Sequence, residues 1–136
     1  MKEHPQHILD CVLQAWNREA AHWESQRLSS LYTQDAVFFG GRPGHSVGAA
    51  EIASYFDSYH GVILTAKLKL LDQQLLKLSD DCIMTQGFGE FEFVLAGNKS
   101  TSSTLRTTLV ICRDASDWKI SAHHFSTIPS APPLGD

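Results

Sequence analysis

Arg106 and His124 are the residues whose types and surroundings in this sequence could do chemistry. Arg106 stands in the stretch LRTTLV, where an arginine among apolar and hydroxyl residues is costly unless it is paired or faces a polar cavity. A guanidinium that faces a cavity would bind a carboxylate or a similar planar anion through two parallel hydrogen bonds. The alternative is a position on the outer face of a sheet, solvated or paired with Glu90 or Glu92.

His123 and His124 are adjacent, so in a strand their side chains point to opposite faces and cannot easily ligate one metal ion together. In strict alternation, Trp118, Ile120 and Ala122 share the face of His124, and this apolar series predicts that His124 faces inward. A histidine that faces a ligand can donate, accept or shuttle a proton. The alternative is a core histidine that is hydrogen-bonded to the surrounding structure.

The register of the last hairpin decides whether Arg106 and His124 meet. With Arg113 opposite Asp117, Arg106 lies opposite His124 and shares its face. With Arg113 opposite Trp118, the two side chains fall on opposite faces and the site is lost. Pairing of apolar side chains across the strands favours the first register.

Further candidates for a site come from the N-terminal half of the chain. Asp35 is a weak candidate for catalysis, as is His124, although an aspartate before a strand more commonly caps a turn. Trp16, Tyr32 and Tyr59 are expected in the core, with one or two of them forming pocket walls. The loop GGRPGH lacks the Lys-Ser/Thr of a phosphate loop, and no metal-ligand spacing is present. We therefore expect neither a cofactor nor a metal.

Composition and charge restrict the class of protein. The chain has 136 residues, of which 43% are hydrophobic and 19% charged, as expected for one folded domain over 1–136 with loose ends at 1–5 and 130–136. Its net charge is -4, and its eleven Lys and Arg residues are scattered singly. Neither nucleic acid nor a membrane surface is therefore an expected partner.

The cysteines and the N-terminus indicate the compartment. Cys11, Cys82 and Cys112 are an odd number in apolar segments, which predicts buried free thiols in a reducing environment. The N-terminus has no apolar run of the signal-peptide kind, and no eighteen apolar residues run together. These features predict a cytoplasmic protein.

The elements that must position these residues follow from hydrophobic periodicity. Apolar residues at three- and four-residue steps predict a helix from Ile8 to Trp23, a short helix at Leu28–Tyr32 and a third helix between Gly48 and Gly61. The apolar run AVFF after Asp35 predicts a short strand.

The second half of the chain changes to a period of two. Strands are predicted at Ala66–Leu70 with an extension to Leu78, at Cys82–Leu95, at Ser102–Arg113 and at Trp118–Ser126. Gly87 and Gly89 predict a bulge or bend in the second of these strands. This order predicts an α+β fold in which three N-terminal helices cover one face of a strongly bent antiparallel sheet.

Local sequence links this element order to a known superfamily. The segments LYTQDAVFFG, GHSVGAAEIASYF, LRTTLV and DWKISAHHFSTIP resemble the nuclear transport factor 2-like superfamily from about Ile8 to Pro129. Within it, the chain is most similar to small polyketide-cyclase-like domains and to the association domain of calcium/calmodulin-dependent protein kinase II. The most specific pieces are Arg106-x-Thr108-x-Val110, Trp118-Lys119-Ile120 and His124-x-Ser126.

The resemblance implies a cone whose bent sheet wraps around the helices and leaves an internal pocket. It also implies a homodimer formed through the outer sheet face. The expected function is binding of a small polar or anionic molecule, such as a carboxylate, with Arg106 as anchor and His124 as partner. As an enzyme, such a domain would be a cofactor-free isomerase, dehydratase or cyclase. The alternative is a non-catalytic association module.

Overall fold

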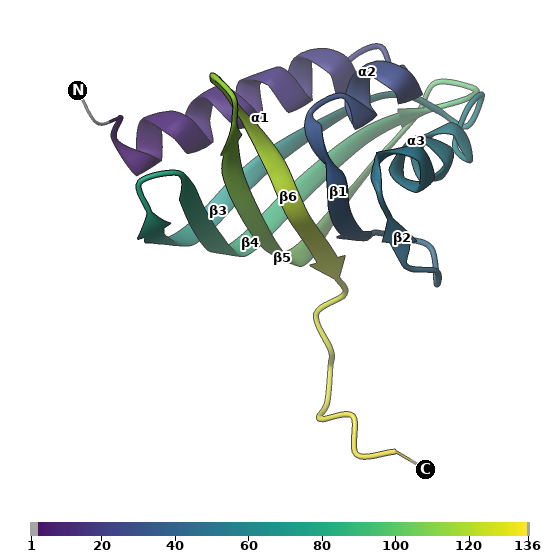
Figure 1. Cartoon of the computed structure of the whole chain (residues 1–136). Coiled ribbons are helices and arrows are strands. Elements are labelled where there is room, and N and C mark those ends of the chain that lie inside the picture. The colour runs from purple at the N-terminus through teal and green to yellow at the C-terminus, as the bar shows by residue number, and fades with distance from the viewer. Residues whose placement is uncertain (1–2, 136) are drawn as a thin grey trace.

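Three helices lie against a single six-stranded sheet in the computed structural model, which describes residues 3–135. The sheet has the order β2-β1-β6-β5-β4-β3 and is open, with β2 and β3 at its edges (Figure 1). The elements are α1 (Pro5–Ala20), α2 (Ser25–Ser29), β1 (Tyr32–Phe39), β2 (Ser46–Val47), α3 (Ala49–Asp57), β3 (Ile63–Ser79), β4 (Cys82–Leu95), β5 (Lys99–Asp114) and β6 (Asp117–Ser126). The α+β architecture predicted from the sequence is confirmed.

Helix α1 begins at Pro5, where the missing N–H and the fixed φ of proline suit a first turn. The His4 side chain accepts a hydrogen bond from the Gln6 backbone N–H at 3.2 Å and caps the helix. Its buried stripe consists of Ile8, Leu9, Val12, Trp16 and Ala20. Trp23 was predicted to continue this stripe but lies beyond the helix, with φ at 44°, and its indole N–H donates to the Phe56 carbonyl.

Strand β1 departs from the sequence prediction in two ways. The short second helix ends at Ser29, and Tyr32 opens the strand instead of closing the helix. The sheet is also mixed, since β1 runs parallel to β6 while the other neighbouring strands are antiparallel. The helix α3 and the long strands β3 to β5 make up the crossover that a parallel pairing needs.

The long hairpin of β3 and β4 carries a bulge on β3, not on β4 as the glycines suggested. The register shifts between Leu71 and Gln74, and Asp72 takes a positive φ of 51°. Gly87 lies opposite, and a Cβ there would approach the Asp72 carbonyl oxygen to 2.6 Å. Because Gly87 has no side chain, it leaves room for the bulge that the extra residue makes in β3.

Another bulge, in β6, sets the orientation of the C-terminal histidines. Ile111 pairs with Ile120, but Val110 pairs with Ala122, so Ser121 is one residue in excess. Side chains alternate across a strand, and an extra residue reverses the alternation beyond it. His123 therefore follows Ile120 to the inner face of the sheet.

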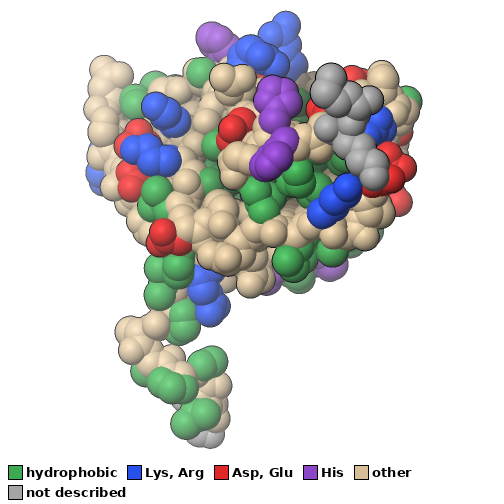
Figure 2. Space-filling model, turned by 90° about the vertical axis from the view of Figure 1, so that its left-hand side faces the viewer, with side chains coloured by type: hydrophobic (Ala, Val, Ile, Leu, Met, Phe, Trp, Pro, Cys, Tyr) green, Lys and Arg blue, Asp and Glu red, His purple; other side chains and the backbone are tan. Residues whose placement is uncertain are grey.

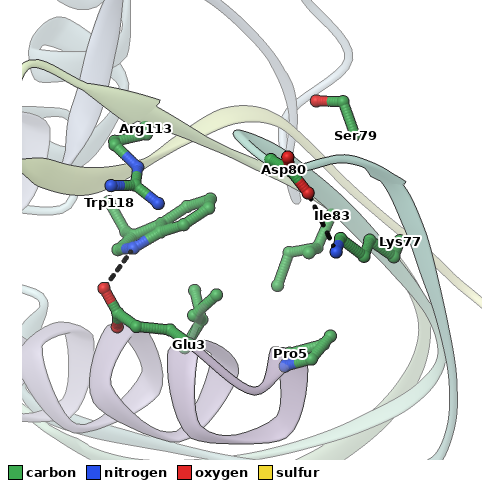
Figure 3. A pocket seen from close by; sticks show the side chains of 9 residues that line it. Glu3, Pro5, Lys77, Ser79, Asp80, Ile83, Arg113 and Trp118 are labelled. Atoms are coloured by element: carbon green, nitrogen blue, oxygen red, sulfur yellow. Dashed lines mark hydrogen bonds and ion pairs between the residues drawn. The ribbon is translucent and has the colours of Figure 1, made fainter. Parts of the chain in front are cut away.

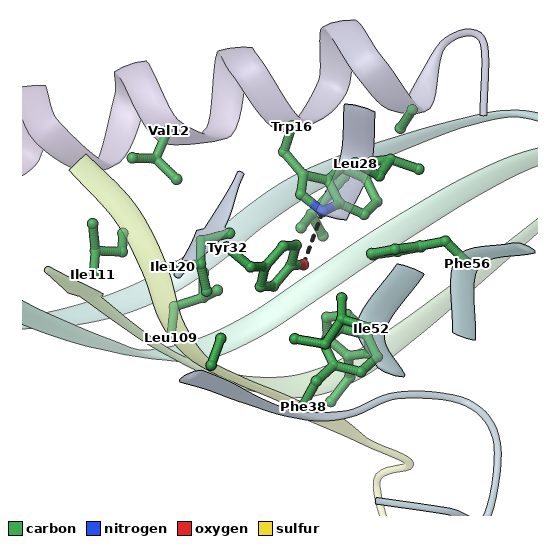
Figure 4. Close-up of a cluster of buried hydrophobic side chains, with 14 of the residues drawn as sticks. Val12, Trp16, Leu28, Tyr32, Phe38, Ile52, Phe56, Leu109, Ile111 and Ile120 are labelled. Carbon is green, nitrogen blue, oxygen red and sulfur yellow. Dashed lines mark hydrogen bonds between the residues drawn. The ribbon is translucent and has the colours of Figure 1, made fainter. Parts of the chain in front are cut away.

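The core between helices and sheet combines aliphatic side chains with aromatic rings, several of which pack edge to face (Figure 4). Beyond β6, residues 127–135 extend away from the body, and Leu134 is 92% exposed (Figure 1). Residues 1–2 and 136, which belong to the expected loose ends, lie outside the described residues. Within residues 3–135, none of the helices has the length and apolarity that crossing a bilayer requires.

The close approach at Gly87 gives a stability prediction. Gly87→Ala forces the Asp72 backbone to move, and we expect it to lower the free energy of unfolding by about 1–3 kcal/mol. Gly44→Ala is the matched control, because a Cβ at Gly44 meets nothing within 4 Å. Urea unfolding of both variants measures the difference, and equal stabilities would contradict the bulge at Asp72.

Candidate functional site

A pocket of about 410 Å³ opens between α3, the end of α1 and the inner face of the sheet. Its wall is mainly aromatic and is formed by Trp16, Trp23, Phe56, Phe91, Phe93 and Phe125. Tyr55, Tyr59, Thr101 and Ser103 add hydroxyl groups, and Leu105 closes one side. Among the described residues, the lining contains no carboxylate, imidazole, lysine or arginine. The pocket is therefore suited to a mainly apolar molecule with few polar groups.

The rim of this pocket is held by the loop that precedes β2. The Gly41 backbone N–H donates to the Tyr55 hydroxyl at 2.8 Å, and burial raises the pKa of Tyr55, so its phenol stays neutral. The Arg42 guanidinium lies 4.2 Å above the Tyr59 ring and donates to Ser58. These contacts fix the loop on α3 and bring a guanidinium to the rim.

A buried hydrogen-bonded series of three side chains, Trp16, Tyr32 and His123, lies behind the pocket wall. The Trp16 indole N–H donates to the Tyr32 hydroxyl at 3.2 Å (Figure 4), and that hydroxyl lies 2.8 Å from His123 Nδ1. Burial raises the pKa of Tyr32, whereas burial and the neighbouring His124 lower the pKa of His123 well below its usual 6.5. The imidazole is therefore neutral. We assign the Tyr32 proton to the bond with Nδ1, which leaves the His123 hydrogen on Nε2.

Two buried polar atoms lack a hydrogen-bond partner within the described residues. One is Nε2 of His123, which belongs to this hydrogen-bonded series, and the other is Oγ1 of Thr107. His123 is only 2% exposed, as is Thr107. A buried donor without an acceptor is uncommon, and a water molecule or a ligand group is the usual explanation.

The structure places the predicted pair of Arg106 and His124 together, but on the outer face of the sheet. Both are exposed and line a shallow groove of about 530 Å³, where Arg106 donates to Ser126 at 3.3 Å. The prediction that they face the pocket is wrong. Arg106 alternates with the buried Thr107, and the bulge in β6 turns His124 outward while His123 enters the core.

The predicted register of the last hairpin is also wrong. Arg113 pairs with Trp118, not with Asp117, and the bulge then brings Arg106 opposite Ser126. Neither of the two registers considered from the sequence therefore holds over the whole hairpin.

The remaining predicted residues are divided between pocket and surface. Trp16 and Tyr59 line the pocket, and Tyr32 lies one layer behind it, in ring contact with Phe56. Asp35 is exposed on β1 and accepts a hydrogen bond from the Thr33 hydroxyl at 3.0 Å. Asp35 lies within β1 and bonds a side chain, so the prediction that it precedes the strand and caps a turn is wrong, and Asp35 lies outside the pocket.

Sequence reasoning missed the pocket residues of β4 and β5. Phe91, Phe93 and Leu95 alternate in one strand, and Thr101, Ser103 and Leu105 alternate in the next. This period of two was visible in the sequence, but only the helix–sheet arrangement shows that these inner faces border a cavity. Among the described residues, no group of three or more His, Cys, Asp or Glu could hold a metal ion.

A second cavity of about 330 Å³ lies at the other end of the sheet (Figure 3). Its charged side chains already have partners: Lys77 pairs with Asp80 at 3.0 Å and Arg113 with Asp81 at 3.1 Å, and Glu3 accepts a hydrogen bond from Trp118 at 3.3 Å. Basic and acidic side chains are also interspersed over this end of the molecule (Figure 2). We therefore place the candidate site in the aromatic pocket.

The bent sheet, the covering helices and the pocket together define a nuclear transport factor 2-like cone, as the sequence resemblance implied. Residues 9–131 match the SnoaL-like domain, and the chain belongs to this family. No protein with a curated description matches the sequence.

Three solved structures illustrate the breadth of this fold. A protein from Xanthomonas campestris, assigned as a calcium/calmodulin dependent protein kinase II association domain, has a TM-score of 0.85 at 20% identity and covers 95% of this chain and 91% of its own. An NTF2-like superfamily protein from Salmonella enterica has a TM-score of 0.75 at 17% identity, and the match covers 97% of this chain and 96% of the Salmonella protein. ActVI-ORFA from Streptomyces coelicolor has a TM-score of 0.73 at 13% identity, and the match covers 89% of this chain and 95% of ActVI-ORFA. At these identities the likeness shows the fold.

The burial of neutral His123 predicts a pH dependence of stability. Below about pH 6.5 the unfolded chain binds a proton at His123 that the folded chain does not, so acid lowers the free energy of unfolding. Below pH 6.5, we expect the free energy of unfolding of the wild type, measured relative to that of His123→Gln, to fall by about 1.4 kcal/mol for each pH unit. Urea unfolding from pH 8 to pH 5 measures this shift. If the difference in free energy of unfolding between the two proteins does not change with pH, His123 has the same pKa in the folded and the unfolded chain, which would contradict its burial as a neutral group.

Proposed function

We propose that this protein binds a small, mainly aromatic molecule in the cone pocket. The observation that carries the proposal is the lining itself, in which eight aromatic side chains surround about 410 Å³ and none of the described lining residues carries a charge. A small anion, the ligand first expected, would lose its hydration inside the pocket without gaining a cation, because the Arg42 guanidinium lies at the rim and is not part of the lining. The hydroxyls of Tyr55, Tyr59, Thr101 and Ser103 are suited to hold one polar group of the ligand.

We further propose that any reaction in this pocket uses the His123 Nε2–H as a hydrogen-bond donor that stabilises developing negative charge. Loss of the Nε2 hydrogen from a neutral imidazole would leave a buried anion, so the unpartnered Nε2–H is suited to donate a hydrogen bond to an oxygen that gains negative charge. Phe125 stands between the pocket and His123, with ring centroids 4.1 Å apart, so rotation of this ring would join the two. Cofactor-free isomerisation, dehydration or cyclisation, reactions for which the fold is used elsewhere, would suit such a group.

The homodimer expected from the superfamily is a separate proposal. Val37 and Val47 pair across β1 and β2 and are 38% and 51% exposed, and Phe39 is 40% exposed nearby on the same outer face. Apolar side chains grouped at a sheet edge favour contact with a second copy. Such a contact is common to the ligand-binding interpretation and to the association-module alternative, so only ligand binding separates them.

Ligand binding is tested by thermal shift and calorimetry with 2-naphthol and 2-naphthoate, two probes of equal ring size. We expect 2-naphthol to raise the unfolding temperature more than 2-naphthoate, because the lining holds no cation to pair with the carboxylate. Leu105→Trp fills the pocket and is expected to weaken 2-naphthol binding at least tenfold.

Arg106→Ala is the matched control for this experiment. It changes the neighbouring residue in the same strand, but on the outer face, and is expected to leave 2-naphthol binding unchanged. No binding of either probe, or loss of binding in Arg106→Ala alone, would contradict the pocket proposal. Circular dichroism of both variants confirms that they fold.

The dimer is tested by sedimentation of Phe39→Glu. We expect the wild type to sediment as a dimer and Phe39→Glu as a folded monomer, because a carboxylate cannot be buried at an apolar contact without a partner. Leu64→Glu is the control, since Leu64 is 44% exposed but lies on β3 at the other edge of the sheet. A monomeric wild type, or dissociation by both variants alike, would refute a contact centred on Phe39.

A further inference from the structure

Two cysteines face each other across strands β4 and β5. Cys82 and Cys112 are direct cross-strand partners, and their sulfur atoms lie 3.1 Å apart. Both are partly exposed free thiols, whereas Cys11, on α1, is exposed. The cysteines were predicted to be buried, and this is wrong, because Cys82 alternates with the buried Ile83 and so points to the outer face of the sheet.

The backbone geometry of this pair favours a covalent link. The Arg113 N–H donates to the Asp81 carbonyl at 2.8 Å, so these neighbours occupy a hydrogen-bonded position of the ladder. Cys82 and Cys112, one residue further along, therefore form a non-hydrogen-bonded pair, with Cα atoms about 4.5 Å apart. This separation lies within the range of roughly 4.4–6.8 Å found in disulfides. The sulfurs need to approach by only about 1 Å to reach bonding distance.

We propose that Cys82 and Cys112 are a redox modification site that forms a reversible intramolecular disulfide. With oxidised glutathione as oxidant, the Cys112 thiolate attacks one sulfur of the glutathione disulfide, and a mixed disulfide forms as one glutathione thiolate leaves. The Cys82 thiol then loses its proton to solvent and attacks the Cys112 sulfur, which releases the second glutathione thiolate. Two electrons pass to the oxidant, which takes up two protons as two glutathione thiols.

The order of these two attacks follows from the surroundings of Cys82. Burial and the neighbouring Cys112 thiol raise the pKa of Cys82 to about 11, so Cys82 is protonated near neutral pH. A thiol attacks only as its thiolate, and Cys82 is therefore assigned the second, intramolecular step.

The disulfide would stiffen one end of the cone. It closes the segment between residues 82 and 112, which contains the β4–β5 hairpin, and so restricts the unfolded chain. Ile83 and Arg113, next to the two cysteines, both line the cavity at that end of the sheet (Figure 3). Oxidation is therefore expected to act on this end, away from the aromatic pocket.

The test is a glutathione redox titration of the native full-length protein. After equilibration in buffers of graded reduced and oxidised glutathione, free thiols are blocked by alkylation and the cross-linked peptide is measured by mass spectrometry. We expect a Cys82–Cys112 cross-link that dithiothreitol reverses, with Cys11 alkylated or glutathionylated but not cross-linked. The unfolding temperature of the oxidised protein should rise by roughly 5–15 °C.

Three serine variants make the outcome specific. Cys11→Ser should keep both the cross-link and the rise in unfolding temperature, and Cys82→Ser should stop at a stable mixed disulfide on Cys112. Cys112→Ser should lose the cross-link as well. Circular dichroism establishes that each variant is folded. Wild-type protein in which Cys82 and Cys112 stay free or are glutathionylated independently would overturn the proposal, as would intermolecular disulfides alone.

Discussion

The excess residue Ser121 in β6 determines what lies inside the cone and what lies outside it. Without this bulge, strict alternation from Ile120 would bury Ala122 and His124 and turn His123 to solvent. With it, the short Ala122 is half-buried and His123 and Phe125 enter the core. A shift of one residue thus exchanges the two adjacent imidazoles, so that His123 is buried and His124 is exposed.

The resulting interior joins an apolar pocket to a buried series of hydrogen-bonded side chains. Trp16 belongs to both, since its ring lines the pocket and its N–H holds the Tyr32 hydroxyl. The Tyr32 hydroxyl in turn orients His123, which keeps an unpartnered Nε2 in a region that excludes charge. Low polarity keeps both groups neutral, and neutral groups hydrogen-bond to each other without the large cost of burying an ion.

Much of the fold could be predicted from the sequence because its signals are local and repeated. The apolar stripe of α1 and the alternation of Ala66 to Leu70 each extend over several residues, so a single exception does not hide them. The site could not be predicted in the same way. The placement of Arg106 and His124 depends on one extra residue, and nothing in ISAHHF distinguishes a bulged strand from a regular one. The walls from β4 and β5 become neighbours of Trp16 only through long-range pairing.

The orientation of His123 is tested most directly by nitrogen-15 NMR of the histidine side chains. A buried His123 bonded through Nδ1 to Tyr32 should keep a hydrogen on Nε2 only, and should stay neutral as the pH falls through 6.5 toward 5. A His123 that gains a second proton near pH 6.5, or that carries its hydrogen on Nδ1, would contradict this account of the cone.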